Sequence, residues 1–307
     1  MVDHWQLTAQ RGYFSHDNDP ESWDFRATTQ PDLGLYDLTL PSDDNTPSED
    51  NQSTISPTNA KWARFLHHVE HLNNEDPKNK MYKMFYLIRH GQGVHNVKEA
   101  EVGRLEWNRH WSKLPGDSTK IWLDAELTIL GEQQAKDIAR FCQHEKLPAP
   151  QSIYSSPLRR ALRTTQLAFA PFLSTNSTTS TPSTPCTVPI IKEKLRETNG
   201  VHTCDQRSPK SWIARNYPSF RIEDEFIEDD ELWDADRREA FEEHMERSRQ
   251  LLNEIFESDE NRSIALVAHT GSIRAIFAAT GWKKVPVATG SVYPLLVCRS
   301  RVAVSSE

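Results

Sequence analysis

The stretch FYLIRHGQGVHN, residues 85–96, joins a run of apolar residues to a short polar loop. Its first four residues form a continuous apolar run of the kind found in buried parallel strands. The run ends in Arg89 and His90, and Gly91 follows directly. In open α/β sheets, ligands bind beyond the carboxyl ends of the strands. The stretch is therefore either a buried strand that happens to end in polar residues, or a strand that delivers a histidine to a site.

Beyond residue 83 the sequence alternates between strand-like and helical patterns, which favours an α/β fold. We expect a three-layer α/β/α sandwich with a mainly parallel sheet and an inserted cap region. Ser156 and Pro157 are suited to be the N-cap and the first residue of a helix. The expected strands are 83–90, 151–156, 188–191, 263–269 and 291–298, and the expected helices are 127–143, 156–170, 241–255 and 271–280.

The flanking segments differ in composition from this alternating region. Residues 41–60 are rich in Pro, Ser, Asn and acidic residues, which is typical of a mobile loop. Trp62, Phe65 and Val69 then follow one another at the spacing of an amphipathic helix. The sequence therefore predicts an N-terminal extension at 1–80 with that loop and one helix, a main domain at 81–300 with a low-complexity insertion at 174–187, and a tail at 301–307.

Composition and charge exclude several classes of protein. A net charge of −8 argues against broad binding to nucleic acid or to anionic membranes, because either requires a wide basic surface. The N-terminus lacks a signal-peptide pattern, and no apolar run approaches the ~18 residues of a membrane span. We expect a soluble protein, monomeric or homodimeric, that resides in the cytoplasm or also in the nucleus.

The cysteines and one histidine pair offer little support for a metal site. His67 and His71 lie one helical turn apart but lack the HExxH order and a third ligand. The four cysteines form no CxxC pair, so neither a zinc knuckle nor a disulfide framework is indicated. They are Cys142, Cys186, Cys204 and Cys298.

Polar residues follow three of the expected strands and should meet at one edge of the sheet. Arginine forms bidentate hydrogen bonds with phosphate, and helix N-termini add backbone donors. A phosphate ester is therefore the natural ligand of this edge. The residues are Arg89, His90 and Gly91 after the first strand, Ser155, Ser156 and Arg160 after the second, and His269, Thr270 and Gly271 after the later one.

A histidine at a strand tip can attack phosphorus itself and divide one difficult displacement into two easier ones. The departing oxygen then needs a proton from a nearby carboxylic acid. Glu197, in KLRETNG, is the first candidate for this acid. Its rivals are Glu225, Glu228 and Asp230, although an acidic run of that kind is usually a solvated segment.

Each of these residues also has a purely structural interpretation. His90 alone could be a strand-end histidine with satisfied hydrogen bonds, and Arg159 or Arg163 could take the place of Arg160. The coincidence of His90, Arg160 and His269 at matching strand ends favours a functional site.

The motifs, taken together, resemble those of a known family. RHGQGVHN is similar to the RHGxxxHN signature of the histidine phosphatase superfamily, in its phosphoglycerate mutase-like branch. Within that branch the chain resembles a fungal group related to yeast Pmu1. Further similar blocks occur in the family's order between residues 82 and 280, namely SSPLRRALRTT, LRETNGVHTCDQR, EDDELWDADRRE and VAHTGSIRA.

The resemblance implies a role for each matching residue. His90 would be the phosphorylated nucleophile, Arg89 and Arg160 would bind the phosphoryl group, and His269 would be the second pocket histidine. It implies no metal or cofactor, and a cap formed around 97–122 and 198–234. The remaining implied roles are secondary phosphate contacts from Asn96, Thr270 and Gly271, the proton donor Glu197, and a substrate contact from Arg207.

Two departures bear on specificity. Glycolytic mutases carry Glu-Ser after RHG, whereas this chain has Gln92 and Gly93, so altered substrate contacts are expected there. The RHGxRxP pattern of secreted histidine acid phosphatases is absent. We therefore expect a phosphatase that hydrolyses a small phosphorylated metabolite through a phosphohistidine. The alternatives are a phosphomutase that moves the group within its substrate, and an inactive protein that binds a phosphorylated ligand.

Overall fold

The strands of the protein form one sheet. The computed structural model describes residues 4–17, 30–37, 57–173, 188–283 and 285–302. Within these residues a seven-stranded sheet has the order β1-β7-β2-β6-β3-β4-β5. The strands are β1 (His4–Gln10), β2 (Lys80–Arg89), β3 (Ser152–Ser155), β4 (Ile190–Ile191), β5 (Arg221–Ile222), β6 (Ser263–Ala268) and β7 (Val292–Val302).

The sheet is mainly parallel, as expected. Strands β2, β6, β3, β4 and β5 run parallel to one another, and β7 lies antiparallel between β1 and β2. Parallel neighbours end at the same edge of a sheet. The polar residues that follow β2, β6 and β3 are therefore brought together.

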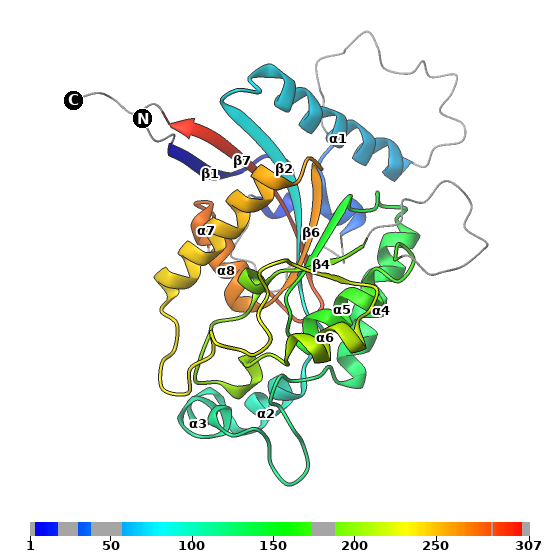
Figure 1. Cartoon of the computed structure of the whole chain (residues 1–307). Helices are drawn as coiled ribbons and strands as arrows, with labels where there is room; N and C mark the ends of the chain where they lie inside the picture. Colours follow the sequence, from blue (N-terminus) through cyan, green and yellow to red (C-terminus); the bar gives the residue numbers. More distant parts are fainter. Residues whose placement is uncertain (1–3, 18–29, 38–56, 174–187, 284, 303–307) are drawn as a thin grey trace.

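Helices cover both faces of the sheet and make it the middle of three layers (Figure 1). Along β2, Tyr86 and Ile88 pack into one core cluster, whereas Phe85 and Leu87 pack into the other. This alternation follows from the two-residue period of a strand. The first cluster includes residues of α1 (Pro57–Glu75), α4 (Ile129–His144) and α5 (Arg159–Ala168), and the second includes residues of α7 (Phe241–Ser258) and α8 (Thr270–Ala279).

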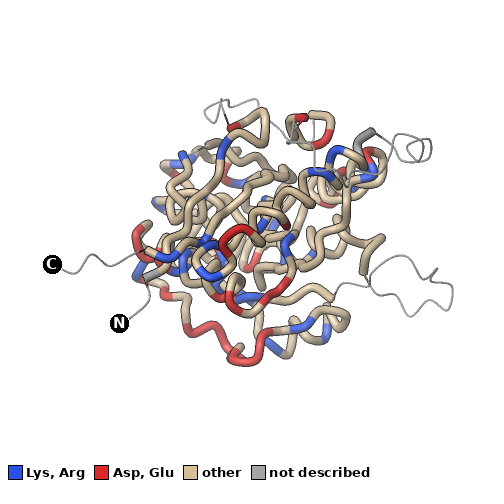
Figure 2. The backbone as a smooth tube through the Cα atoms, turned by 90° about the horizontal axis from the view of Figure 1, so that it is seen from above, with Lys and Arg blue, Asp and Glu red and all other residues tan. Residues whose placement is uncertain are grey.

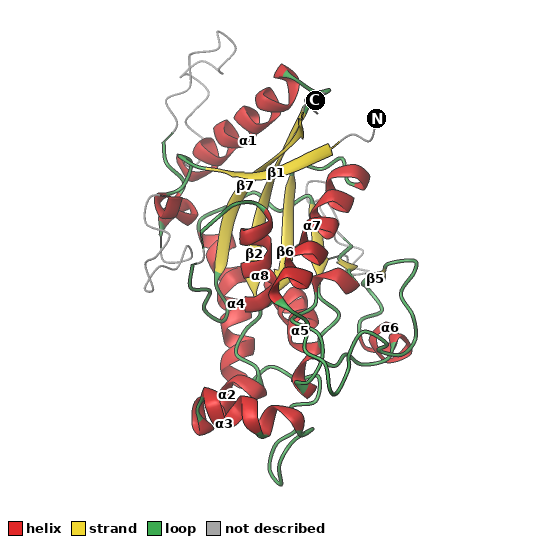
Figure 3. Cartoon of the chain, turned by 90° about the vertical axis from the view of Figure 1, so that its left-hand side faces the viewer, coloured by secondary structure: helices red, strands yellow, loops and turns green. Residues whose placement is uncertain are grey.

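Short helices extend beyond the carboxyl end of β2. Figure 3 shows α2 (Val94–Val102) and α3 (Arg104–Arg109) below the sheet, past the strand ends. A third, α6 (Lys210–Asn216), lies in the segment between β4 and β5. These helices fall within the segments in which the cap was expected. Among the described residues, no helix is both long enough and apolar enough to cross a membrane.

The flanking segments differ from expectation in three places. Residues 4–10 form β1, which pairs with β7, so the N-terminal extension contributes a strand as well as a helix to the fold. Residues 57–60, expected in the mobile loop, already belong to α1. The predicted tail begins with two residues of β7, Arg301 and Val302. Three predicted segments lie wholly or mainly outside the described residues, namely the rest of the loop predicted at 41–60, the insertion at 174–187 and the rest of the tail. The division into domains stays a prediction.

Candidate active site

Close backbone packing fixes the loop that follows β2. A Cβ atom on Gly91 would lie 2.1 Å from the carbonyl oxygen of Gly131, in the first turn of α4. Only glycine allows this approach. The Gly91 N–H donates to Thr164 Oγ1 of α5 at 3.1 Å. The space beside Gly91 is therefore filled by α4, and the loop that carries His90 is held between α4 and α5.

The buried imidazole of His90 is fixed in one tautomer. Its Nδ1 lies 2.6 Å from the Gly91 carbonyl oxygen, and Arg160 Nε donates to its Nε2 at 3.3 Å. A carbonyl only accepts and a guanidinium only donates, so the hydrogen is on Nδ1 and the lone pair is on Nε2. Burial, followed by the charges of Arg160 and Arg89, lowers the pKa of His90 well below its usual value. The ring is neutral with an available Nε2, as a nucleophile requires.

His269 takes the opposite tautomer. Arg160 Nε also donates to its Nδ1, at 3.2 Å, so its hydrogen is on Nε2, which lies 2.7 Å from Ser156 Oγ. Burial, Arg160 and His90 lower the pKa of His269 well below its usual value. Ser156 is thus not the N-cap that we predicted. Helix α5 begins at Arg159, and Ser156 instead accepts the hydrogen bond of this histidine.

A buried ion pair orients Arg160. The side chain is 1% exposed, and its Nη2 donates to Asp205 Oδ1 at 2.8 Å while its Nη1 donates to the Cys204 carbonyl. The other oxygen of Asp205 accepts from Arg238 at 2.9 Å. Burial alone would raise the pKa of Asp205, but the charges of Arg238 and Arg160 outweigh it and lower that pKa to about 2. The carboxylate stays ionised and directs Arg160 Nε toward the two histidines.

Arg89 has a buried donor that is available to a ligand. Its Nη1 donates to the Val287 carbonyl at 2.6 Å, whereas its buried Nε has no hydrogen-bond partner among the described residues. Burial lowers the pKa of Arg89 to about 10, so the side chain is charged at neutral pH. A buried donor without a partner is costly unless a ligand supplies an acceptor.

Glu197 occupies the N-terminus of α8. Its Oε2 accepts the Gly271 N–H at 3.0 Å, and its Oε1 accepts the Thr198 N–H at 2.9 Å. A Cβ on Gly271 would lie 1.8 Å from Glu197 Oε1, so glycine is required for this contact. The Gly271 N–H, which we expected to bind phosphate, therefore serves the carboxylate. The neighbouring Thr270 Oγ1 is buried and has no hydrogen-bond partner in the described part of the chain.

Arg89, His90, Arg160 and Glu197 line a cavity of about 510 Å³ that is rich in positive charge. His269, predicted as the second pocket histidine, is fully buried and does not line the cavity, but it contacts Arg160. Basic and acidic residues are interspersed along the described backbone (Figure 2), whereas five arginines and three carboxylates gather around this cavity. Its histidines have lowered pKa values, so two positive charges are in excess. That excess matches a phosphate monoester dianion. The charged residues are Arg89, Arg104, Arg160, Arg238, Arg274, Glu99, Glu197 and Asp205.

Comparison with known proteins identifies the family. Residues 85–295 match the histidine phosphatase superfamily (branch 1). The chain belongs to this superfamily.

The chain is also similar to named relatives and to solved structures. The chain is 37% identical over 293 residues to a "Probable phosphoglycerate mutase" of Arthroderma benhamiae, covering 93% of this chain and 82% of the relative. It is 35% identical over 234 residues to the "Probable phosphoglycerate mutase PMU1" of Saccharomyces cerevisiae, covering 70% and 76%. Among solved structures, "Mycobacterial hydrolase 1" aligns with a TM-score of 0.42 at 24% identity, covering 70% of this chain and 91% of that chain.

Two predicted substrate contacts do not line the cavity of this superfamily member. Gln92 accepts from Thr128 through its side chain at 2.9 Å, and its N–H donates to Gln134 at 2.7 Å. Arg207 is 4% exposed and donates to Glu193 and to four backbone carbonyls. Both side chains are occupied by structural contacts, which gives no support to the predicted role.

Asn96 does line the cavity, and its Oδ1 accepts the Gly93 N–H at 2.9 Å, which closes the first turn of α2. Other lining residues were not anticipated. His95 stands within the quoted signature, and Arg274 lies one helical turn after Thr270. The charged residues and histidines of the lining that were not predicted as site residues are His95, Glu99, Arg104, His202, Asp205, Arg238 and Arg274.

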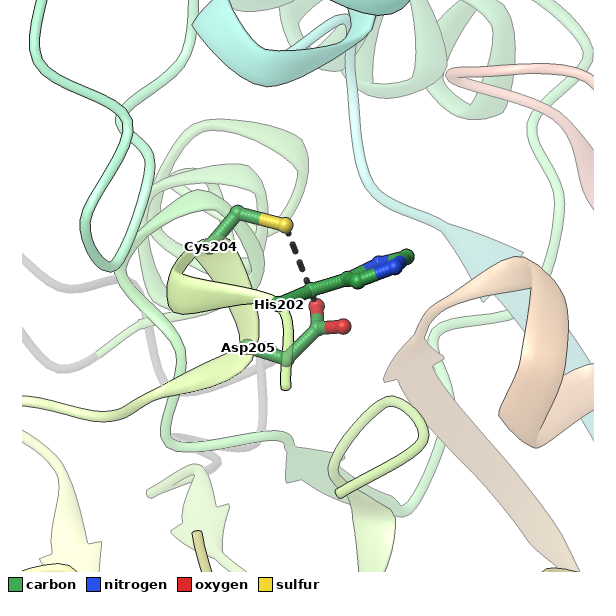
Figure 4. Close-up of side chains that lie close together, drawn as sticks. All are labelled: His202, Cys204 and Asp205. Carbon is green, nitrogen blue, oxygen red and sulfur yellow. Dashed lines mark hydrogen bonds between the residues drawn. The ribbon is translucent and has the colours of Figure 1, made fainter. Parts of the chain in front are cut away.

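One cluster at the cavity has residue types that bind metals. His202, Cys204 and Asp205 bring their ligand atoms within 4.8 Å of one another, and Figure 4 shows Cys204 Sγ directed at the Asp205 carboxylate. That carboxylate already pairs with two arginines. Burial raises the pKa of the Cys204 thiol well above its usual value. A cation would have to displace Arg160 and Arg238, so this donor set does not fit a metal.

The neutral buried histidines should make the protein less stable as the pH falls from 7.5 to 5.5. An unfolded chain binds protons below a histidine pKa of about 6.5, whereas the folded protein does not. The free energy of unfolding should then decrease by up to about 1.4 kcal/mol per pH unit for each such residue. Urea unfolding at the two pH values measures this. The residues are His16, His90, His95, His202, His244 and His269.

The matched control is His144→Ala, which removes a largely exposed histidine and should leave the pH dependence unchanged. His244→Asn removes one of the buried histidines and should reduce it. A free energy of unfolding that is the same at pH 7.5 and 5.5 would contradict the neutral state of these side chains.

Proposed function

We propose that this histidine phosphatase superfamily member hydrolyses a small phosphorylated metabolite through a phosphohistidine at His90, without a metal. The observation that carries the proposal is the fixed tautomer of His90. Its Nε2 lone pair lies beside Arg160, in a cavity with two positive charges in excess. A neutral nucleophile next to cations suits attack on a phosphate dianion.

In the first step, His90 Nε2 forms a bond to phosphorus and the bond from phosphorus to the ester oxygen breaks. Arg89 and Arg160 stabilise the negative charge on the phosphoryl oxygens. Arg160 Nε, which now donates to both histidines, would donate to a phosphoryl oxygen instead. Glu197, which lines the cavity and is counted as ionised in the free site, would take up a proton when the substrate dianion binds and pass it to the departing oxygen.

In the second step, a water molecule attacks the phosphohistidine and Glu197 accepts its proton. The bond from His90 Nε2 to phosphorus breaks, and inorganic phosphate leaves. The cavity of about 510 Å³ falls within the range of small-molecule sites, so it can hold a substrate or water beside the phosphoryl group.

A phosphomutase is the second candidate, because relatives of this chain carry the name of probable phosphoglycerate mutases. In that reaction a second hydroxyl of the substrate, rather than water, takes the phosphoryl group from His90. An inactive binding protein is the third candidate. The presence of His90, Arg160 and Glu197 around one cavity, with His269 hydrogen-bonded to Arg160, favours a catalyst.

Replacing the nucleophile should abolish turnover. We expect His90→Ala to lower the rate of p-nitrophenyl phosphate hydrolysis by at least about 10³-fold, because no other group replaces Nε2. His144→Ala, at an exposed site, is the matched control and should keep the full rate. Hydrolysis by His90→Ala at the wild-type rate would refute a phosphohistidine route.

An assay in ¹⁸O-labelled water with a phosphorylated polyol, which has a second hydroxyl, separates the candidates. Hydrolysis places one solvent oxygen in each phosphate released, whereas a mutase returns an isomer of the substrate without solvent oxygen. Neither product should form with an inactive binding protein.

The proton donor can be tested through the leaving group. A p-nitrophenolate ion departs without a proton, whereas an alkoxide needs one. Glu197→Gln should therefore slow hydrolysis of an alkyl phosphate by about 10²-fold or more, and affect release of p-nitrophenolate in the first step much less. Burst kinetics measure that step alone. Equal losses for both substrates in that step would remove Glu197 from this role.

A further inference from the structure

His95 stands beside the nucleophile with a nitrogen that has no partner. It lies in the first turn of α2, is 7% exposed and lines the cavity. The centroids of the His95 and His90 rings are 5.7 Å apart. Its Nδ1 is buried and has no hydrogen bond among the described residues. A buried polar atom without a partner is costly, and here it belongs to a residue that lines a cavity.

Gly93 makes room for this ring. A Cβ on Gly93 would lie 2.6 Å from both Nδ1 and Cε1 of His95, which is closer than real contacts allow. The Gly93 N–H is held by Asn96, and the neighbouring Gln92 is tied to Thr128 and Gln134. The Gln92-Gly93 pair therefore does not touch a substrate, but it shapes the loop so that His95 can reach the cavity.

The groups that act most strongly on the pKa of His95, and His269 whose pKa His95 lowers, belong to the phosphoryl site. They come from four elements, with Arg89 and His90 at the end of β2, Arg160 in α5, Asp205 in the loop after β4, and His269 before α8. Burial and the nearby arginine charges lower the pKa of His95 well below its usual value. The ring is thus a neutral imidazole with a single N–H, placed where a phosphate dianion would bring acceptors.

We propose that His95 is a phosphoryl-binding residue that donates Nδ1–H to a phosphoryl oxygen, and that Gly93 is its positioning residue. The proposal rests on the proposed function only in assigning a phosphoryl ligand to the cavity. It adds a third imidazole to the site and gives a reason for glycine at position 93.

The test measures binding of inorganic phosphate to the full chain by calorimetry, together with kcat and KM for p-nitrophenyl phosphate. An asparagine amide can place its nitrogen near the position of Nδ1, and a glutamine amide places its nitrogen near that of Nε2. We expect His95→Phe and His95→Gln to weaken phosphate binding by about 10- to 100-fold, and His95→Asn to stay within about threefold of wild type.

Several outcomes would overturn the proposal. They are wild-type affinity in His95→Phe, an equal loss in His95→Asn and His95→Phe, and no phosphate binding by the wild-type protein. If the wild-type protein binds phosphate but forms no phosphohistidine, the proposed function fails, and the affinities of the three variants still decide on His95.

The positioning role of Gly93 is tested by a double-mutant cycle. Gly93→Ala should weaken phosphate binding to a similar extent as His95→Phe, and the double variant should be no weaker than His95→Phe alone. Val94→Ala, at the adjacent position of the same turn, is the matched control and should bind as wild type. Additive losses would contradict the positioning role, because they would show that Gly93 acts independently of His95.

Discussion

The buried guanidinium of Arg160 is the interaction on which the rest of the site depends. Its Nε–H is shared by His90 and His269, and its two other nitrogens are held by Asp205 and the Cys204 carbonyl. A buried charge of this kind persists only when it is paired, and Asp205 supplies the pair. The same contact sets the tautomers of both histidines, because a guanidinium can only donate.

The sheet brings these partners together. His90, His269, Arg160 and Glu197 follow β2, β6, β3 and β4, which are consecutive neighbours in the sheet. Because these strands are parallel, the four loops lie at one edge of the sheet. Backbone packing of Gly91 against Gly131 fixes the position of the loop that follows β2. The chemistry of the site is therefore a consequence of strand order and of glycines at two close approaches, Gly91 and Gly271.

The fold class and the central residues could be predicted because they depend on local patterns. Apolar runs that end in polar residues identified β2, β3 and β6, and their direction made His90, Arg160 and His269 neighbours. Side-chain direction could not be predicted in the same way. Gln92 and Arg207 have the right composition for ligand contacts, but tertiary neighbours occupy both. Strand β1 was missed because its identity comes from pairing with β7, nearly 300 residues later.

The most direct measurement of the central claim is the ¹⁵N NMR spectrum of the histidine side chains at pH 7, with the two signals assigned through His90→Asn and His269→Asn variants. The structure requires two neutral rings of opposite tautomer, with the hydrogen on Nδ1 of His90 and on Nε2 of His269. Spectra with this pattern would support the claim that Arg160 holds His90 in the tautomer whose Nε2 lone pair can attack phosphorus. A protonated His90, or a His90 with its hydrogen on Nε2, would contradict it.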